Sequence, residues 1–398
     1  MNFKIRVIPI ILESCDWQNH QLSDFQALPD GVVPINQWDH EDDGWQNVVA
    51  GIRKVVDKMQ SQTDSTSGVF EDELLAELVF QQGNVLLMFG QIDSAIEAYS
   101  HAITLNPNNA AAYNNRGNAY NDKGEYDHAL KDYNTAIQLK PDFAEVYNNR
   151  GNAYNGKEEY DRAIEDYNTA IQLKPNLADA YTNRGIAYNS TGEYDRAVAD
   201  YNMAIQLKPN SADAYANRGV AYDKQGDFDR AIEDCNIAIQ LKPNLADAYT
   251  NRGNAYGNKG EYDRAIEDCN IAIQLKPNSA DAYNNRGIAY GNKGEYDRAI
   301  EDCNIAIQLK PNSATAYNNR GSAYGNKGNF DRAIEDYNMA IELKPDYADA
   351  YNNRGPTYGN KGEYDRAIED FNTAIQLNPH DTKAYTNRSV AYELKEKS

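Results

Sequence analysis

The chain contains 398 residues, with 60 acidic against 39 basic side chains and a formal net charge of -21. This negative excess argues against a nucleic-acid binder, which must neutralise phosphates, and against docking on an anionic membrane. Four cysteines without zinc-ligand spacing indicate neither a disulfide scaffold nor a metal site. The longest apolar run, Val7 to Leu12, is interrupted by Pro9 and is too short to span a bilayer. We therefore expect no nucleic-acid partner, no membrane partner, no metal and no other cofactor.

Residues 1–70 differ in composition from the rest, since they hold all the tryptophans and none of the tyrosines. Residues 3–12 form a short β-branched run that predicts a buried strand, and residues 32–35 could form a second strand. A helix capped by Asp42 or Asp43 follows, with apolar side chains at spacings of three and four. Residues 59–70 read as a polar linker.

Three strings in residues 1–58 carry a family resemblance: RVIPIILESCDW, FQALP and PINQWDHEDDGWQNVVAGIRKVV. Together they resemble the C-terminal part of a bacterial TIR domain, so we expect a partial α/β fragment here, from a mis-called start or a truncated remnant. The family's catalytic glutamate lies on a helix that precedes this stretch, and neither Glu13 nor Glu41 matches it. No catalytic residue is carried over. A signal peptide is the rival reading of residues 1–15; Pro9 and the shortness of the apolar run argue against it, so we expect a cytoplasmic protein.

From residue 76 onward the sequence repeats at a constant interval, marked by Pro107, Pro141, Pro175 and further prolines up to Pro379. A fixed period in the range of roughly 20–50 residues indicates a stacked array. In the unit 110–143, Tyr113, Gly117 and Tyr120 follow helical spacing, and a second such face runs from Ala129 to Ile137. Gly124 separates the two faces and Pro141 ends the second. Each unit is thus predicted to be a helical hairpin.

The pattern of tyrosine, glycine, alanine and proline in each unit resembles the tetratricopeptide (TPR) signature. The resemblance implies an all-α fold, a TPR α-solenoid in which helical hairpins stack into a right-handed superhelix, preceded by the α/β fragment. We assign residues 71–381 to nine repeats and residues 382–398 to a C-terminal capping helix whose charged end suits solubility. The repeats are 76–109, 110–143, 144–177, 178–211, 212–245, 246–279, 280–313, 314–347 and 348–381.

Several positions carry local expectations. Arg116 and its copies stand where the family usually has leucine, and we expect the stem to cover apolar surface while the head reaches water. Asp268 should pair with Arg264 on a solvated helix face, since the two are four positions apart. Pro356 should kink or fray its helix, because it cannot donate to the carbonyl of Asn352. Three cysteines take a core position of the second helix, where we expect buried apolar side chains: Cys235, Cys269 and Cys303.

A polar stripe on the first helix of each unit is the candidate binding site. The sixth position of the units is asparagine and the second is mostly aspartate, with Glu145 as a variant. In TPR folds this face lines the concave groove, although it could also be only a solvated helix face. The pattern is similar to the asparagine ladder of the TPR superhelix in O-linked N-acetylglucosamine transferases. The proposed groove residues are Asn115, Asn149, Asn183, Asn217, Asn251, Asn285, Asn319, Asn353, Asn387, Asp179, Asp213, Asp247, Asp281 and Asp349.

These residues favour a non-catalytic scaffold that binds a protein or peptide partner. Asparagine both donates and accepts hydrogen bonds, so it can bind the N–H and C=O groups of an extended peptide whatever the side chains of that peptide are. Because basic clamp residues are missing and aspartate recurs, the groove should prefer polar or basic segments over acidic tails. No catalytic or metal-binding motif occurs in the chain. The alternative is a truncated TIR-TPR signalling or NAD-cleaving protein whose catalytic part lies outside this sequence.

Overall fold

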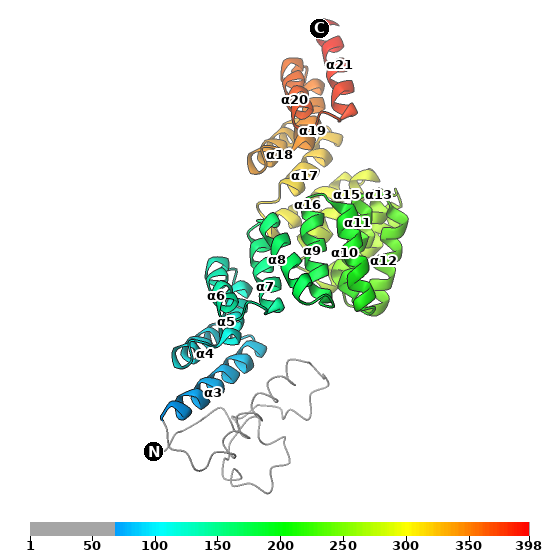
Figure 1. Ribbon diagram of the computed structural model, residues 1–398. Helices are drawn as coiled ribbons and strands as arrows, with labels where there is room; N and C mark the ends of the chain where they lie inside the picture. Colours follow the sequence, from blue (N-terminus) through cyan, green and yellow to red (C-terminus); the bar gives the residue numbers. More distant parts are fainter. Residues whose placement is uncertain (1–67, 398) are drawn as a thin grey trace, which may run out of the picture. The chain divides into compact units, whose positions relative to one another are not determined.

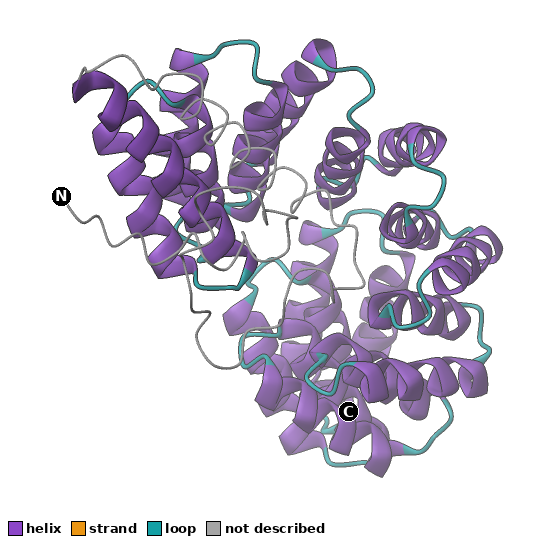
Figure 2. Ribbon diagram, turned by 90° about the horizontal axis from the view of Figure 1, so that it is seen from below, coloured by secondary structure: helices purple, strands orange, loops and turns teal. Residues whose placement is uncertain are grey.

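The computed structural model describes residues 68–397, with the side chains of residues 68–71 and 74 left out. Nineteen helices and no strand occur in this part of the chain, which confirms the all-α fold class (Figure 2). The expected TIR-like fragment, its strands and helix, and the linker up to residue 67 lie outside the described residues. The first helices of the hairpins are α3 Gly68–Met88, α5 Ala110–Asp122, α7 Ala144–Gly156, α9 Ala178–Ser190, α11 Ala212–Lys224, α13 Ala246–Asn258, α15 Ala280–Asn292, α17 Ala314–Asn326, α19 Ala348–Asn360 and α21 Thr382–Lys397. The second helices are α4 Ile92–Leu105, α6 Tyr126–Leu139, α8 Tyr160–Leu173, α10 Tyr194–Leu207, α12 Phe228–Leu241, α14 Tyr262–Leu275, α16 Tyr296–Leu309, α18 Phe330–Leu343 and α20 Tyr364–Leu377.

The chain divides into two compact units, with the boundary after Ala187. In the first unit α5 packs against α6 within one hairpin, and α6 packs against α7 of the next (Figure 1). The second unit repeats this order, with α12 between α11 and α13 and α14 between α13 and α15. Each helix therefore contacts only its near neighbours along the chain, as expected of a repeat array.

The loop inside each hairpin is turned by one residue in the left-handed backbone region. Gly124 holds this place after α5 with φ of 76°, where glycine has no steric penalty. In the next repeat Glu158 takes the same position with φ of 62°, so one loop of the first unit tolerates a side chain there. The backbone N–H of Gly124 donates to the carbonyl of Asn121, which closes the end of the first helix.

The core of a hairpin is one aromatic ring lying on one glycine. The Tyr133 ring is 1% exposed, and a Cβ placed on Gly117 would come within 2.7 Å of it. The Tyr133 hydroxyl passes beyond the glycine and donates to Asn118 Oδ1 at 2.8 Å. Alanines on the second helix fill the remaining space, with Ala129 and Ala136 fully buried. Glycine is thus required opposite the ring, because any side chain would displace it.

In three successive repeats a cysteine replaces this ring, and the prediction that these thiols are buried is confirmed. Each is at most 1% exposed, and burial raises its pKa to about 12. A Cβ on Gly253 would meet the Cys269 sulfur at 3.1 Å, so the smaller side chain leaves slightly more room beside the glycine. The three thiols are unpaired: Cys235, Cys269 and Cys303.

The prediction for Arg116 and its copies is wrong. The Arg116 guanidinium does not reach into water but donates to both carboxylate oxygens of Asp132 at 2.7 Å, while a third N–H reaches Ser100 of the preceding hairpin. Asp132 raises the pKa of Arg116 through these bonds. The arginine therefore joins both helices of its own repeat to the second helix before it. The same bidentate pair recurs as Arg150 with Asp166, Arg218 with Asp234, Arg252 with Asp268, Arg286 with Asp302, Arg320 with Asp336 and Arg354 with Asp370.

The prediction of a surface ion pair between Arg264 and Asp268 is also wrong, because Asp268 is the buried aspartate of such a bidentate pair. Asp268 is 4% exposed and accepts from Arg252, which lies on the first helix of its own repeat. Arg264 is exposed and pairs instead with Glu261, three positions before it. A buried carboxylate needs a fully satisfied partner, and the planar arginine fork supplies it.

Pro356 does not shorten its helix, so the prediction of early fraying is wrong. Helix α19 covers 13 residues, as α17 does, and Pro356 sits on its exposed side. A difference is seen at the end of the helix. There the N–H of Lys361 donates to Tyr358 at 3.0 Å, whereas the matching N–H of Lys327 reaches one residue further back, to Ala323. One hydrogen bond is lost without ending the helix.

Helix α21, the expected C-terminal cap, packs on α20 and leaves several apolar side chains exposed. Ala384 and Ala391 are buried, while within residues 68–397 no further helix follows α21 to cover its other side. Arg388 donates to Asn372, but it has no aspartate of its own repeat. Four large apolar side chains are exposed on this helix: Tyr385, Val390, Tyr392 and Leu394.

Candidate binding groove

Six of the predicted groove asparagines are hydrogen-bonded to the preceding repeat. Asn149 Nδ2 donates to Asn114 Oδ1 at 3.0 Å in the first unit, and Asn319 Nδ2 donates to Asn284 Oδ1 at 2.9 Å in the second. These bonds join residues on neighbouring first helices. We call this set the paired asparagines: Asn115, Asn149, Asn183, Asn319, Asn353 and Asn387.

The other three asparagines differ, because no hydrogen bond reaches their side chains within the described part of the second unit. The acceptor that serves Asn319 is an asparagine 35 residues earlier. For Asn251 that place is Ala216, and for Asn285 it is Thr250, whose hydroxyl donates to Ala246 instead. All three amides are half-buried and retain their donors and acceptors. We call them the open asparagines: Asn217, Asn251 and Asn285.

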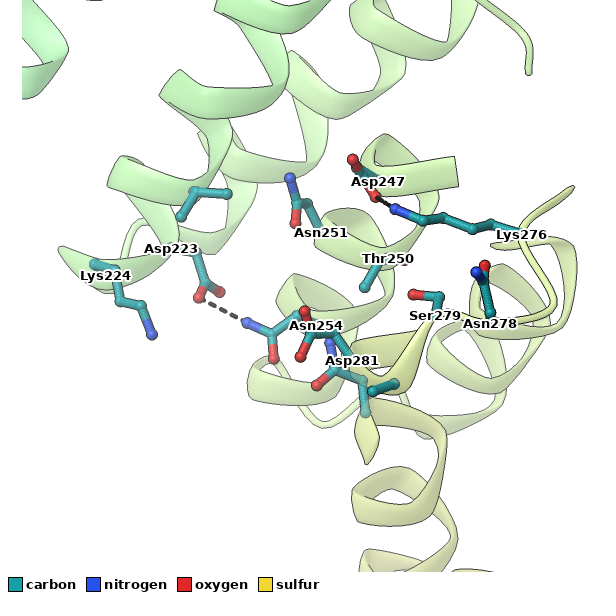
Figure 3. A pocket seen from close by; sticks show the side chains of 13 residues that line it. Asp223, Lys224, Asp247, Thr250, Asn251, Asn254, Lys276, Asn278, Ser279 and Asp281 are labelled. Carbon is teal, nitrogen blue, oxygen red and sulfur yellow. Dashed lines mark hydrogen bonds and ion pairs between the residues drawn. The ribbon is translucent and has the colours of Figure 1, made fainter. Parts of the chain in front are cut away.

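A pocket of about 570 Å³ lies beside two of the open asparagines, between α11, α13 and α15 (Figure 3). Asn251 and Asn285 line it, together with Asp247 and Asp281 from the second position of their repeats. The pocket therefore brings together both residue types that the sequence pattern selects. Nearly all its other lining side chains are polar: Asp223, Lys224, Thr250, Asn254, Lys276, Asn278 and Ser279, with Val220 and Ala280.

Asp223 is the residue in this pocket that the sequence pattern does not mark. It is 8% exposed, and its two oxygens accept from Asn254 Nδ2 at 2.8 Å and Asn258 Nδ2 at 2.9 Å. Burial raises the pKa of Asp223, and the amides of Asn258 and Asn254 oppose that shift. No basic side chain pairs with it within residues 68–397. A comparison among repeats could have singled it out, since the three preceding repeats have asparagine there and the four following have glycine.

The aspartates at the second position are all exposed, so each of them can meet a ligand. Asp247 lies 3.7 Å from Lys276 Nζ, a distance at the limit of an ion pair. Glu145, which replaces aspartate at this position in the repeat 144–177, forms a shorter ion pair, with Lys174 Nζ 2.6 Å away. The exposed set is Asp179, Asp213, Asp247, Asp281 and Asp349.

Two other kinds of site are missing from residues 68–397. No group of histidine, cysteine, aspartate and glutamate has the arrangement to hold a metal ion there. None of the helices in this range has the length and apolar character that crossing a membrane requires.

Comparison with solved structures finds chains of similar fold. Chains of similar structure include the Cut9–Hcn1 hetero-tetramer of the APC/C, at 17% identity and a TM-score of 0.58 over 80% of this chain and 76% of that one. A tetratricopeptide repeat protein from Parabacteroides merdae has 21% identity and a TM-score of 0.51 over 63% of this chain and 98% of that one. YrrB, described as a TPR protein with an unusual peptide-binding site, has 26% identity and a TM-score of 0.35 over 46% of this chain and 95% of that one.

None of the curated proteins compared with the chain matches it. A family profile described as "TPR repeat" matches residues 83–121, 117–157, 151–192 and 186–226. A second profile, described as "Tetratricopeptide repeat", matches residues 212–245, 246–279, 280–313, 314–347 and 348–381. The two profiles together cover most of the chain, which belongs to the tetratricopeptide repeat family.

Proposed function

We propose that the chain is a non-catalytic interaction scaffold that binds an extended polar or basic peptide segment on its first helices. The observation that carries the proposal is the run of three open asparagines, two of which line the 570 Å³ pocket. An asparagine side chain with no hydrogen-bond partner within residues 68–397 is available to a ligand. A peptide backbone offers one N–H and one C=O per residue, which is what a side-chain amide can bind.

The spacing of the open asparagines suits an extended chain. Packed helices lie roughly 8–10 Å apart, and an extended peptide advances about 3.3–3.6 Å per residue. One open asparagine thus meets about every third peptide residue. The three together span roughly five to seven residues of ligand. At about 0.5–1.5 kcal/mol net for each hydrogen bond, binding would accumulate over several weak contacts.

The charge of the same surface favours a basic ligand. Asp213, Asp247 and Asp281 are exposed on the three repeats that carry the open asparagines. An acidic tail would be repelled there, whereas lysine or arginine would be attracted, most strongly at low salt.

The paired asparagines have a different role in this proposal. Their amide hydrogens are engaged by neighbouring helices, as for Asn149 on Asn114 and Asn353 on Asn318. We assign them to holding adjacent first helices in register. The binding window is then residues 212–313 and not the whole stripe of asparagines.

Selection from a displayed library of random dodecapeptides tests this function. The immobilised chain and its Asn217→Ala/Asn251→Ala/Asn285→Ala variant are used in parallel. Enrichment of lysine- or arginine-containing polar sequences on the unaltered chain, and not on the variant, is the expected result. Enrichment of acidic or strongly apolar sequences, or of the same sequences on both proteins, would contradict the proposal.

A second candidate function rests on the sequence of residues 1–58, which resembles part of a TIR domain. In that case the array is the sensing arm of a TIR-TPR signalling or NAD-cleaving protein. The chain of residues 1–398 should release no nicotinamide from NAD, because none of its residues matches the family's catalytic glutamate. Measurable NAD cleavage by the purified chain would contradict this expectation.

A further inference from the structure

Three departures from the repeat pattern coincide in residues 212–313. Cysteine replaces the aromatic ring of the core, the asparagine that accepts from the next repeat is missing, and Asp223 stands where seven of the other repeats have asparagine or glycine. The pocket lies between the first helices of these same repeats. Substitutions that affect the core, the ladder and the pocket together indicate one specialised site within the array.

The cysteine substitution bears directly on the pocket. In a repeat with a tyrosine in the core, the tyrosine hydroxyl can donate a hydrogen bond to the side chain at the ninth position, as Tyr133 does to Asn118 Oδ1 at 2.8 Å. In the repeat 246–279 the core residue is Cys269, which has no such hydroxyl. The ninth residue, Asn254, is therefore free to turn across the pocket and donate to Asp223. Its Oδ1 remains available as an acceptor.

The pocket offers acceptors from three helices. Asp223 comes from α11, Asn254 from α13 and Asp281 from α15, and Figure 3 shows them around one space. Each Asp223 oxygen accepts one amide N–H, and a carboxylate oxygen has room for a second donor. The acceptors of the pocket thus come from three helices, and both oxygens of the Asp223 carboxylate already hold one amide donor each.

The side chains that line the pocket carry a net negative charge. Three carboxylates line it, from Asp223, Asp247 and Asp281, against the two ammonium groups of Lys224 and Lys276. Lys276 lies 3.7 Å from Asp247. The charge of Lys224 acts on Asp223 and lowers the pKa of its carboxyl, but no ion pair joins the two side chains within residues 68–397. A buried carboxylate whose hydrogen bonds come only from neutral amides is stabilised when a cation binds it directly.

We propose that this pocket binds the primary ammonium group of a lysine side chain from the bound peptide, with Asp223 as its charged partner. The inference deepens the proposed function and rests on it. An ammonium has three diverging donors, which fit acceptors on three helices. A guanidinium presents a planar fork, which fits one carboxylate approached in its own plane.

Fluorescence anisotropy with a labelled host peptide, (Ser-Gly-Asn-Lys)3, tests the proposal on the full chain. Companion peptides replace lysine by norleucine, which keeps the stem and removes the charge, or by arginine. Loss of a charge-assisted hydrogen bond should weaken binding of the norleucine peptide about tenfold or more. The arginine peptide should bind more weakly than the lysine peptide.

Two protein variants locate the effect. Asp223→Asn should weaken binding of the lysine peptide by a similar factor and leave the norleucine peptide unchanged. The variant should fold, because three other repeats have asparagine at this position: Asn121, Asn155 and Asn189. Its circular dichroism spectrum and melting curve check this. Asp229→Asn is the matched control, since it removes the same charge from the second helix of the same repeat, where Asp229 is exposed and pairs with Lys259.

The outcomes separate the two levels of the proposal. If lysine and norleucine peptides bind alike, the ammonium site is wrong while the groove remains. Arginine binding as tightly as lysine would refute selection for a primary ammonium. Equal losses in Asp223→Asn and Asp229→Asn would mean general charge attraction and would overturn the pocket. If none of the peptides binds at millimolar concentration, the proposed function itself fails.

Discussion

The division of the asparagines into paired and open sets predicts two different results for one substitution. Asn319→Ala removes the hydrogen bond from Asn319 Nδ2 to Asn284 Oδ1 at 2.9 Å, along with a long contact from Asn318 at 3.5 Å. Asn285→Ala removes no side-chain hydrogen bond among residues 68–397. Both positions lie on a first helix, so the gain in helix propensity, at most about 0.7 kcal/mol, is common to both and cancels in the comparison. The difference isolates the ladder bond, which is worth about 0.5–1.5 kcal/mol.

Hydrogen exchange read by mass spectrometry on peptides from α15 and α17 measures this difference locally, which suits an array that need not unfold as one unit. A loss of about 0.5–1.5 kcal/mol corresponds to exchange about two- to thirteen-fold faster in Asn319→Ala than in Asn285→Ala. Faster or equal exchange in Asn285→Ala would refute the division, because it would show that the open asparagine also stabilises the array.

Other substitutions test the packing. Arg252→Met should destabilise the chain by about 3–5 kcal/mol, since Asp268 is then buried without its partner, and adding Asp268→Leu should recover most of the loss; urea unfolding that shows no recovery would contradict this. Gly151→Ala should lower the melting temperature, with an overpacking cost of about 1–3 kcal/mol, because the new Cβ would lie 2.6 Å from the Tyr167 ring; an unchanged melting temperature would show that the ring can move. Relative to the unaltered chain, Asp223→Asn should lose stability as the medium is acidified, because burial raises the pKa of the carboxyl and protonation then relieves the cost of its charge in the folded chain; a relative stability that grows on acidification would contradict this sign. A thiol reagent at pH 8 should leave three cysteines of the folded chain unreacted until urea is added: Cys235, Cys269 and Cys303. Rapid reaction of more than one thiol in the folded chain would contradict their burial.

The fold could be predicted from the period, while several contacts could not. A repeat of constant length with helical spacing inside each unit is local information, and it is enough to predict hairpins that stack. The bidentate pair of Arg116 and Asp132 joins residues 16 apart on different helices. A neighbour one helical turn away, as between Arg264 and Asp268, was the more obvious partner by helical spacing alone. Which helix faces which decides the pairing, and that is a tertiary property.

The candidate site shows the same limit. The asparagine stripe is visible in the sequence, but whether an asparagine is paired depends on the side chain 35 residues earlier, on another helix. Asn285 and Asn319 occupy the same position in their repeats and still differ, because one faces Thr250 and the other Asn284. Asp223 breaks the repeat pattern once, and only its buried contacts give that exception a role.

The most direct test of the binding window compares two matched triple variants in a calorimetric titration with the peptide (Ser-Gly-Asn-Lys)3. One carries alanine at the open asparagines Asn217, Asn251 and Asn285; the other carries alanine at three paired asparagines: Asn149, Asn183 and Asn319. The open triple should bind at least about tenfold more weakly and melt no lower than the unaltered chain, since it loses only bonds to the ligand. The paired triple should melt lower and keep its affinity. Equal loss of affinity in both, or a loss only in the paired triple, would contradict a binding window at residues 212–313.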